Sequence, residues 1–568
     1  MLVLQQAQAP RRVKPSGKIG PFIVLGDGSL LSIYVEGRKS AEWRNLDVAQ
    51  HLLLRRSSDG GRTWSEPEAI VSHPEQGALA LGYALFADAA GRIHQLYLVL
   101  FDWEEHLPYA ERKIEMRAIT SIDEGRTWSK PRLIDYGHSY TGSINAVTVL
   151  GSGRIVVPFS YMSQRQTGCF VSTAIYSDDH GESWQHADSE LALDNGGSES
   201  ESGAVEPVTV ELPDGRIWMV IRTQAGKLYE SYSADGGATW SAPSPTAFVS
   251  SNAPAGLLRL KDGSIVMVWN HCNGEPFRGG ISYARQSLVA AIRGADGTWR
   301  GYREIVGMRR GDDEEQLYCY PWMAELEDGG VLVGYYDVHL ARFEQSLVFR
   351  TVRFDPAWLV EPEAALGGEL YGDGEFAQVA ATQAGVDTAP GREGAGALRL
   401  NVEGNGPSAG VTWNFPLLVK GELVIKLRTG NRFAGAYVTL AESFLLPGNR
   451  QAGLFRLRLE PGGGLSVQRA NEGPYLPLPG KKPAAVAGAD GAAAADDGGW
   501  REFVIGWDCT RELASLRANG AFAGMLPQLE RGVGVSYVRF HLEAEGELLI
   551  ESLRSIAPAG QKEGESRQ

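Results

Sequence analysis

The first two thirds of the chain alternate between apolar and polar residues over short stretches. Two examples are GRIWMVIRT at residues 215–223 and GSIVMVWNH at residues 263–271. Alternation with a period of two predicts strands, because successive side chains of a strand point to opposite faces. Each stretch follows a short glycine-containing turn of the kind that joins antiparallel strands. Such turns occur at residues 26–28, 90–91, 151–153, 214–215, 262–263 and 328–329. The pattern therefore predicts six hairpin units.

An eight-residue motif, Ser-x-Asp-x-Gly-x-Thr/Ser-Trp, recurs between these hairpins. Its four copies occupy residues 57–64, 121–128, 177–184 and 233–240. Successive aspartates are 64, 56 and 56 residues apart, and a degenerate fifth copy, RGADGTW, ends at Trp299. We expect each Asp carboxylate to accept hydrogen bonds from its own turn, and each Trp to pack on the sheet. A strand–turn–strand unit repeated in this way predicts a β-propeller with six blades of four short strands.

The pattern changes after about residue 355. The eight-residue motif stops, and about nine alternating stretches follow at regular spacing, which predicts an antiparallel β-sandwich. The expected fold class is therefore all-β. The expected organisation is an N-terminal arm at residues 1–17, a six-bladed propeller at 18–358, a β-sandwich at 359–557 and a disordered tail at 558–568.

Composition and charge narrow the range of functions. Glycine supplies 70 of 568 residues, about 12% against a usual ~7%, as expected for many tight turns. The chain has 54 basic and 69 acidic residues, a net charge of −15. Binding to a phosphate backbone needs a basic footprint, so nucleic acid is not an expected partner.

The spacing of the cysteines does not predict a metal centre, and the length of the apolar runs does not predict a membrane segment. Four cysteines are scattered along the chain without zinc-ligand spacing, and we expect neither a metal nor a cofactor. No apolar run approaches the ~18 residues of a membrane span, and the first residues do not read as a signal peptide. We expect a cytoplasmic protein, with non-standard secretion as the alternative. The oligomeric state stays open.

The repeated motif resembles the Asp box, or BNR repeat, of the sialidase (neuraminidase) superfamily. The resemblance implies a six-bladed propeller as the catalytic domain. The predicted sandwich is similar to the concanavalin-like jelly-roll domains that are often appended to glycosidases. Asp boxes are turn devices that also occur in proteins without glycosidase activity, so they indicate the fold and leave the activity to other residues.

Three further segments carry the resemblance to the sialidase site. The segment EPVTVELPDGRIWMVIRT at residues 206–223 is similar to the one that carries a catalytic glutamate and a substrate-binding arginine, which assigns these roles to Glu206 and Arg222. Arg285 resembles the second arginine of the substrate-binding triad, with Arg278 as a competitor. In YCYPW at residues 318–322, Tyr320 is the closest match to the nucleophilic tyrosine, and Tyr318 is the alternative.

These residue types suit a sugar that carries a carboxylate at its anomeric carbon. A carboxylate nucleophile would meet like-charge repulsion there, which a neutral phenol avoids. A phenol with an ordinary pKa near ~10 needs an adjacent base, a role that fits Glu206. Arginine forks match a substrate carboxylate bidentately and stay charged.

One position departs from the family pattern, and two others are filled by candidates. The Arg-Ile-Pro phrase of the first blade corresponds here to KIGP, so Lys18 stands where the family has arginine. Loss of one charged hydrogen-bond pair, about 1.5–3 kcal/mol, lowers binding roughly 10- to 150-fold. Arg38 resembles a later family arginine and is the third candidate for binding substrate. Asp47 is the candidate general acid. Its competitors are Glu36, Glu42 and His51.

The leading hypothesis is a sialidase-like exo-glycoside hydrolase that removes a terminal, acidic sugar from a glycan. Tyr320, Glu206 and Asp47 would be catalytic, and Arg222, Arg285 and Arg38 would bind the substrate. Two alternatives stay open. One is a propeller that binds glycans without catalysis, and the other is a different propeller glycosidase or lyase that uses paired carboxylates.

Overall fold

The structure is a computed structural model of the 568-residue chain. It describes residues 9–13, 15–39, 47–72, 78–79, 84–101, 111–138, 141, 143–163, 169–193, 202–272, 284–308, 312–342, 348–367, 379–382, 385–391, 396–430, 432–447, 453–478 and 499–558. For residues 37–39, 47–50, 78–79, 202 and 342, only the backbone is described. The chain divides into two compact units. The first comprises Met1–Leu288, Ile292–Gly297 and Glu315–Trp358, and the second comprises Val289–Ala291, Thr298–Glu314 and Leu359–Gln568.

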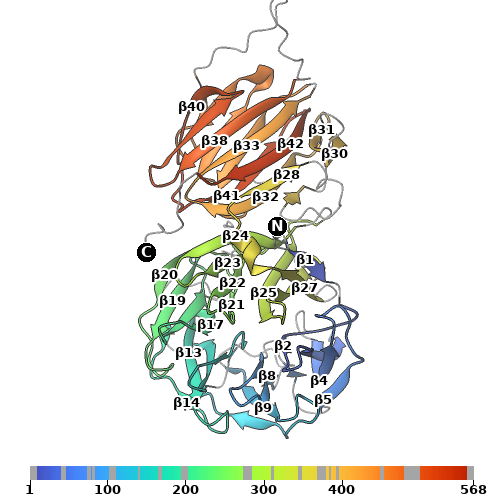
Figure 1. Cartoon of the computed structure of the whole chain (residues 1–568), viewed down its shortest axis with the longest axis vertical. Helices are drawn as coiled ribbons and strands as arrows, with labels where there is room; N and C mark the ends of the chain where they lie inside the picture. Colours follow the sequence, from blue (N-terminus) through green and yellow to red (C-terminus); the bar gives the residue numbers. More distant parts are fainter. Residues whose placement is uncertain are drawn as a thin grey trace, which may run out of the picture. The chain divides into compact units, whose positions relative to one another are not determined.

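Antiparallel sheets of short strands follow one another around a common centre in the first part of the chain (Figure 1). Blade 1 contains β2 (Phe22–Val24), β3 (Leu30–Lys39), β4 (Asp47–Ser57) and β5 (Glu68–Ser72). Blade 2 contains β7 (Ala84–Ala87), β8 (Ile93–Leu100), β9 (Ile114–Ser121) and β10 (Arg132–Ile134), and β6 (Ala78–Leu79) pairs with both β4 and β8. Blade 3 contains β11 (Thr148–Val149), β12 (Ile155–Met162), β13 (Cys169–Ser177) and β14 (Gln185–His186), with β15 (Leu191–Ala192) and β16 (Ser202–Gly203) paired to β13.

The remaining three blades complete the propeller. Blade 4 contains β17 (Val205–Glu211), β18 (Ile217–Arg222), β19 (Lys227–Ser233) and β20 (Ser244–Val249). Blade 5 contains β21 (Gly256–Arg259), β22 (Ile265–Trp269), β23 (Ser287–Arg293) and β24 (Trp299–Gly307). Blade 6 contains β25 (Gln316–Glu325), β26 (Val331–His339), β27 (Val348–Phe354) and β1 (Arg11–Val13), with the short helices η3 (Leu340–Arg342) and α2 (Pro356–Leu359) near its strands. The predicted six-bladed propeller is confirmed.

The N-terminal strand closes the ring. β1 lies in the segment that we expected to precede the propeller as an arm. It pairs with β27, with Arg11 opposite Arg353, and the Thr351 hydroxyl donates to the Val13 carbonyl at 2.9 Å. The sixth blade is thus built from both ends of the propeller sequence, with β1 as its outer strand.

All six hairpin turns share one hydrogen-bond pattern. In each, the N–H of the first residue donates to the carbonyl four residues later, and the N–H three residues later donates back to the first carbonyl. The first residue is Leu25, Asp88, Leu150, Leu212, Leu260 and Leu326 in blades 1 to 6. Five blades bury a leucine at this position, and blade 2 buries an aspartate instead.

The four Asp boxes form the turns that the sequence predicted. In the first box, the Asp59 carboxylate accepts the Ser57 hydroxyl at 2.9 Å and the Thr63 hydroxyl at 2.6 Å, while the Trp64 indole N–H donates to the Gly61 carbonyl at 2.9 Å. The other three boxes repeat the bonds to the carboxylate. In the third box, hydrogen bonds from the Ser183 hydroxyl and N–H lower the pKa of Asp179 to about 2. The carboxylate of each box is therefore satisfied within eight residues of chain.

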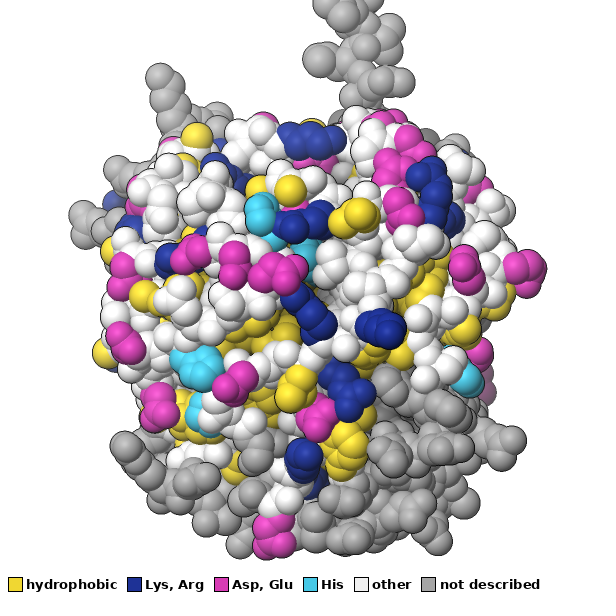
Figure 2. Space-filling model, turned by 90° about the horizontal axis from the view of Figure 1, so that it is seen from below, with side chains coloured by type: hydrophobic (Ala, Val, Ile, Leu, Met, Phe, Trp, Pro, Cys, Tyr) yellow, Lys and Arg dark blue, Asp and Glu magenta, His cyan; other side chains and the backbone are white. Residues whose placement is uncertain are grey.

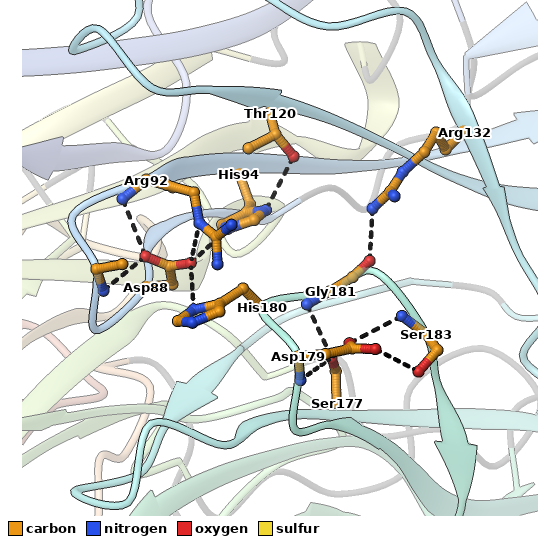
Figure 3. A network of polar contacts seen from close by, with 11 residues as sticks. Asp88, Arg92, His94, Thr120, Arg132, Ser177, Asp179, His180, Gly181 and Ser183 are labelled. Carbon is orange, nitrogen blue, oxygen red and sulfur yellow. Dashed lines mark hydrogen bonds and ion pairs between the residues drawn. The ribbon is translucent and has the colours of Figure 1, made fainter.

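The buried aspartate of blade 2 joins its blade to the next one (Figure 3). The Asp88 side chain has no solvent-exposed area. It accepts hydrogen bonds from the N–H groups of Ala90 and Arg92 and from Arg92 Nε, all at 2.9 Å. It also contacts His94 Nε2 and His180 Nδ1, both at 3.1 Å. Because His180 belongs to the Asp box of blade 3, this carboxylate connects two blades.

The histidine in this network predicts acid-sensitive stability. Burial lowers the pKa of His94 below its ordinary 6.5, although Asp88 opposes the shift. The unfolded chain then binds more protons than the folded one, so this stability is present above pH 6.5 and is lost as the pH falls toward the folded pKa. We expect the thermal midpoint to fall between about pH 7 and about pH 5, and to fall less in His94→Gln. Equal slopes by circular dichroism would contradict this expectation.

The second unit contains two antiparallel sheets with one hydrophobic cluster between them. The eight-stranded sheet contains β28 (Ala364–Gly367), β30 (Val386–Pro390), β31 (Gly396–Val402), β33 (Lys420–Thr429), β38 (Arg501–Asp508), β39 (Leu513–Ala518), β40 (Ala521–Pro527) and β42 (Gly546–Ile556). The seven-stranded sheet contains β29 (Val379–Ala381), β32 (Ala409–Leu418), β34 (Ala436–Ala441), β35 (Phe455–Leu459), β36 (Leu465–Gln468), β37 (Tyr475–Pro477) and β41 (Val535–Leu542), and a short helix, η6 (Pro461–Gly463), lies between β35 and β36. Both sheets contribute to the cluster, which makes the unit sandwich-like. Its resemblance to concanavalin-like domains stays a prediction.

Charges of both signs lie near one another on the face that Figure 2 shows. Basic side chains follow the middle of its described surface, and acidic side chains lie on both sides of them.

Among the described residues, no helix is long and apolar enough to cross a membrane.

Candidate active site

Two residues of the predicted site share an unusual backbone conformation. Glu206 in β17 has φ 46° and Tyr320 in β25 has φ 56°, in the left-handed region that residues with a Cβ avoid. Each lies at a break in strand register, between Val205 and Val208 and between Cys319 and Trp322. A bulge of this kind turns a side chain away from the regular alternation of its strand, and strained residues cluster at functional sites.

The two bulges bring a phenol and a carboxylate together. The Tyr320 hydroxyl donates to Glu206 Oε1 at 2.9 Å, although 114 residues separate them in sequence. Arg222 Nη1 donates to Glu206 Oε2 and lies 3.3 Å from the Tyr320 hydroxyl. A nucleophile within hydrogen-bond reach of a base, with a third group that orients the base, is the geometry of an activated nucleophile.

Asn252 holds both candidate arginines. Its side-chain carbonyl accepts Arg222 Nε at 2.7 Å, and its backbone carbonyl accepts Arg285 Nη2. The Arg285 guanidinium also lies 5.7 Å from the centre of the Tyr320 ring. Arg222 and Arg285 are only 2% and 6% exposed. One asparagine therefore fixes two cations beside the phenol, and no sequence motif marks it.

Two serines complete the surroundings of the carboxylate. The Ser143 hydroxyl donates to Glu206 Oε1 at 3.1 Å, and the Ser160 hydroxyl accepts the Glu206 N–H at 3.1 Å. Ser160 lies in β12 of blade 3, the blade before that of Glu206. The Glu206 carboxylate thus accepts hydrogen bonds from a tyrosine, an arginine and a serine, and the residue is only 9% exposed. These bonds hold one orientation of Glu206.

The alternatives for the tyrosine and the first arginine lie elsewhere. Tyr318 is fully buried and packs edge-on against Tyr335, with ring centres 6.0 Å apart. Lys18, at the position of the absent family arginine, is exposed and lies 5.7 Å from the ring of Tyr34. The structure therefore brings together Glu206, Arg222, Arg285 and Tyr320, and among the tyrosine candidates it places Tyr320 against Glu206.

The remaining candidates whose backbone is described lie in two paired strands of the first blade. Arg38 in β3 and Asp47 in β4 belong to paired strands, where Arg38 is opposite Val48 and Lys39 is opposite Asp47. Their side chains are outside the described residues, as are Glu42 and Arg278. The described competitors are His51, whose Nδ1 lies 2.9 Å from the Ser72 hydroxyl, and Glu36, which is exposed. Among the residues that the structure describes, no cluster of three metal-ligating side chains occurs.

Comparison with known proteins gives one family match and two curated relatives. Residues 85–333 match the model of a BNR repeat-like domain. A sialidase of Micromonospora viridifaciens is 27% identical over 286 residues, which cover 44% of this chain and 41% of that protein. An anhydrosialidase of Macrobdella decora is 30% identical over 243 residues, which cover 38% of this chain and 29% of that protein. The chain thus spans less than half the length of either relative.

Solved structures of sialidases also match the chain. The Trypanosoma rangeli sialidase matches at 13% identity and a TM-score of 0.44, over 97% of this chain and 96% of that one. The intramolecular trans-sialidase of Ruminococcus gnavus, in complex with oseltamivir carboxylate, matches at 15% identity and a TM-score of 0.46, over 62% and 95%. The family match and the two curated relatives agree with the six blades and the Asp-box turns, and together they support a propeller of the sialidase type in which residues 85–333 are similar to a BNR repeat-like domain.

Proposed function

We propose that this protein is a sialidase-like exo-glycoside hydrolase that removes a terminal, acidic sugar from a glycan. The observation that carries the proposal is the 2.9 Å hydrogen bond from the Tyr320 hydroxyl to Glu206. Arg222 lies within hydrogen-bond distance of both side chains. The two curated relatives are named as a sialidase and an anhydrosialidase, which agrees with this reaction class.

In the proposed mechanism, Tyr320 is the nucleophile and Glu206 is its base. As the phenol oxygen bonds to the anomeric carbon, Glu206 Oε1 takes the phenol proton and the bond to the leaving oxygen breaks. A general acid protonates that oxygen. In the second step the same group deprotonates a water that attacks the anomeric carbon, the bond to the Tyr320 oxygen breaks, and Glu206 returns the proton to the phenol. We assign the acid to Asp47 from its place in the sequence.

Arg222 and Arg285 are the proposed clamp for the substrate carboxylate. Guanidinium groups that a protein buries and orients in advance interact with a carboxylate more strongly than exposed ones. Asn252 fixes both forks, so they need little reorganisation on binding. The same cations stabilise negative charge on the phenol oxygen as Glu206 removes its proton.

Hydrolysis of a glycoside panel tests the substrate class. The panel contains an aryl α-sialoside, an aryl glucuronide and neutral aryl glycosides. We expect turnover of a carboxylate-bearing substrate and little turnover of the neutral ones, because the clamp has no partner on a neutral sugar. Binding to glycans without turnover would favour the non-catalytic alternative. Faster hydrolysis of the neutral glycosides would contradict the clamp.

Arg285→Met is expected to lower kcat/KM for the acidic substrate about 10- to 150-fold. This range corresponds to the loss of one charge-assisted contact with the substrate carboxylate. Arg259→Met is the matched control. Arg259 also lies in blade 5, but its side chain is 42% exposed and pairs with Glu211 on the surface. Equal effects of the two substitutions would show that the loss does not come from the clamp.

A further inference from the structure

The seven-stranded sheet of the second unit has one apolar face and one polar face. In β41, Val538, Phe540 and Leu542 belong to the hydrophobic cluster between the sheets. Arg539 and His541 alternate with them and therefore point to the other face. The same alternation in β34 and β35 places their polar side chains on that face as well.

Strand register aligns these polar residues in two transverse rows. The first row runs across six strands, from β32 through β41, β34, β35 and β36 to β37, and contains Thr412, Arg539, Thr439, Arg456, Gln468 and Tyr475. The second row lies beside it and contains His541, Tyr437, Arg458, Ser466 and Pro477. We call these two rows the arginine strip. They place three arginines on one sheet face.

Two of the three arginines of the strip have a carboxylate partner. Arg456 pairs with Glu530, and Arg458 pairs with Glu460 at 2.8 Å. Arg539 is 1% exposed and has no carboxylate within ion-pair distance among the described residues. The strip is therefore left with one buried positive charge that no described side chain balances.

The contacts of Arg539 are weak for a buried cation. Its guanidinium donates to the Leu446 carbonyl at 3.4 Å and to the Thr439 hydroxyl at 3.3 Å. Its Nε has no acceptor in the described part of the chain, and neither has Arg456 Nε. Burial lowers the pKa of Arg539 to about 10; Tyr475 opposes this shift, and the neighbouring Arg456 adds a smaller contribution in the same direction as burial. The group is still charged at neutral pH.

A buried and unpaired charge is costly, and a bound anion removes that cost. We propose that the arginine strip is a binding site for a small oxyanion, a carboxylate, sulfate or phosphate group, held by Arg539 and Arg456. Tyr437, Arg458 and Tyr475 are only half buried, so this end of the strip meets solvent. The Tyr437 and Tyr475 rings lie 5.3 Å apart at that end. The site is independent of the proposed reaction in the propeller.

Calorimetric titration of the full chain tests the site. The ligands are sodium sulfate, sodium phosphate and glucuronate, with glucose as a neutral control and sodium chloride to keep the ionic strength constant. We expect wild type and Arg511→Met to bind at least one oxyanion, and Arg539→Met to bind it at least about tenfold more weakly, which is 1.4 kcal/mol. Arg511 is the matched control because its side chain is 80% exposed in the same unit. The ranking of the three anions distinguishes a planar carboxylate from a tetrahedral group.

A second measurement separates a ligand site from a structural arginine. If the site of Arg539 is empty until an anion binds, Arg539→Met without oxyanion is at least as stable as wild type. The substitution replaces a buried charge that has no carboxylate partner among the described residues with an apolar group of similar length. Loss of thermal stability in Arg539→Met would overturn the proposal, as would equal oxyanion affinity in wild type and Arg539→Met. Arg539→Lys keeps the charge without the fork. It is expected to fold and to bind sulfate more weakly, and wild-type affinity in it would also contradict the proposal.

Discussion

Tyr320→Phe is expected to lower kcat for an acidic glycoside on the order of 10³-fold or more, because it removes the attacking oxygen and leaves the fold intact. The phenyl ring keeps its edge contact with Tyr336, whose ring centre is 6.2 Å away, so we expect the ring at position 320 to keep its place. Steady-state kinetics on the substrate identified in the glycoside panel measures the effect. Circular dichroism and the thermal midpoint check that the variant is folded.

Tyr318→Phe is the matched control for this substitution. Tyr318 lies two residues earlier in the same strand and is fully buried, and no hydrogen bond joins it to Glu206. We expect it to keep most of the activity. Trapping with a fluorinated glycoside and mass spectrometry should locate the sugar on Tyr320. An adduct on a carboxylate would contradict the assignment and favour a glycosidase with paired carboxylates.

Asp88→Asn is expected to destabilise the propeller by about 3 kcal/mol, the lower end of the range for breaking a buried charge network. The carboxylate accepts from Arg92, His94 and His180, and an amide would turn an NH₂ group toward one of these donors. A donor that faces the NH₂ group loses its acceptor, and for His94, whose side chain is 4% exposed, this loss costs more than the bond itself. Chemical denaturation of the full chain, followed by tryptophan fluorescence, measures the loss.

Asp262→Asn is the control for the buried aspartate. Asp262 lies in the equivalent hairpin turn of blade 5, where it is exposed and accepts from the N–H and hydroxyl of Ser264. We expect no comparable loss of stability there. A shift of similar size in both variants would mean that any turn aspartate has this effect, and that the link between blades 2 and 3 contributes nothing.

The sequence was most informative where the hydrogen bonds of a turn form between residues of that same turn. An Asp box needs a hydroxyl, a carboxylate, a glycine and an indole within eight residues, so its hydrogen bonds follow from the local sequence. The proximity of Glu206 and Arg222 could also be predicted from the sequence, because they lie in neighbouring strands joined by a short hairpin. The role of Asp88 could not be predicted in this way, because His180, the partner through which it connects two blades, is 92 residues away in sequence.

The sequence by itself determined the number of blades and the segments that carry the candidate residues, since turns and alternation are encoded over a few positions. Only the tertiary structure decided that Tyr320 rather than Tyr318 meets Glu206, because a bulge in each strand changes the direction in which the side chain points. It also decided the role of Asn252, which no motif marks and which lies beside both arginines once the ring is closed. Contacts between distant segments depend on how every blade packs against the next, and local sequence does not encode that packing.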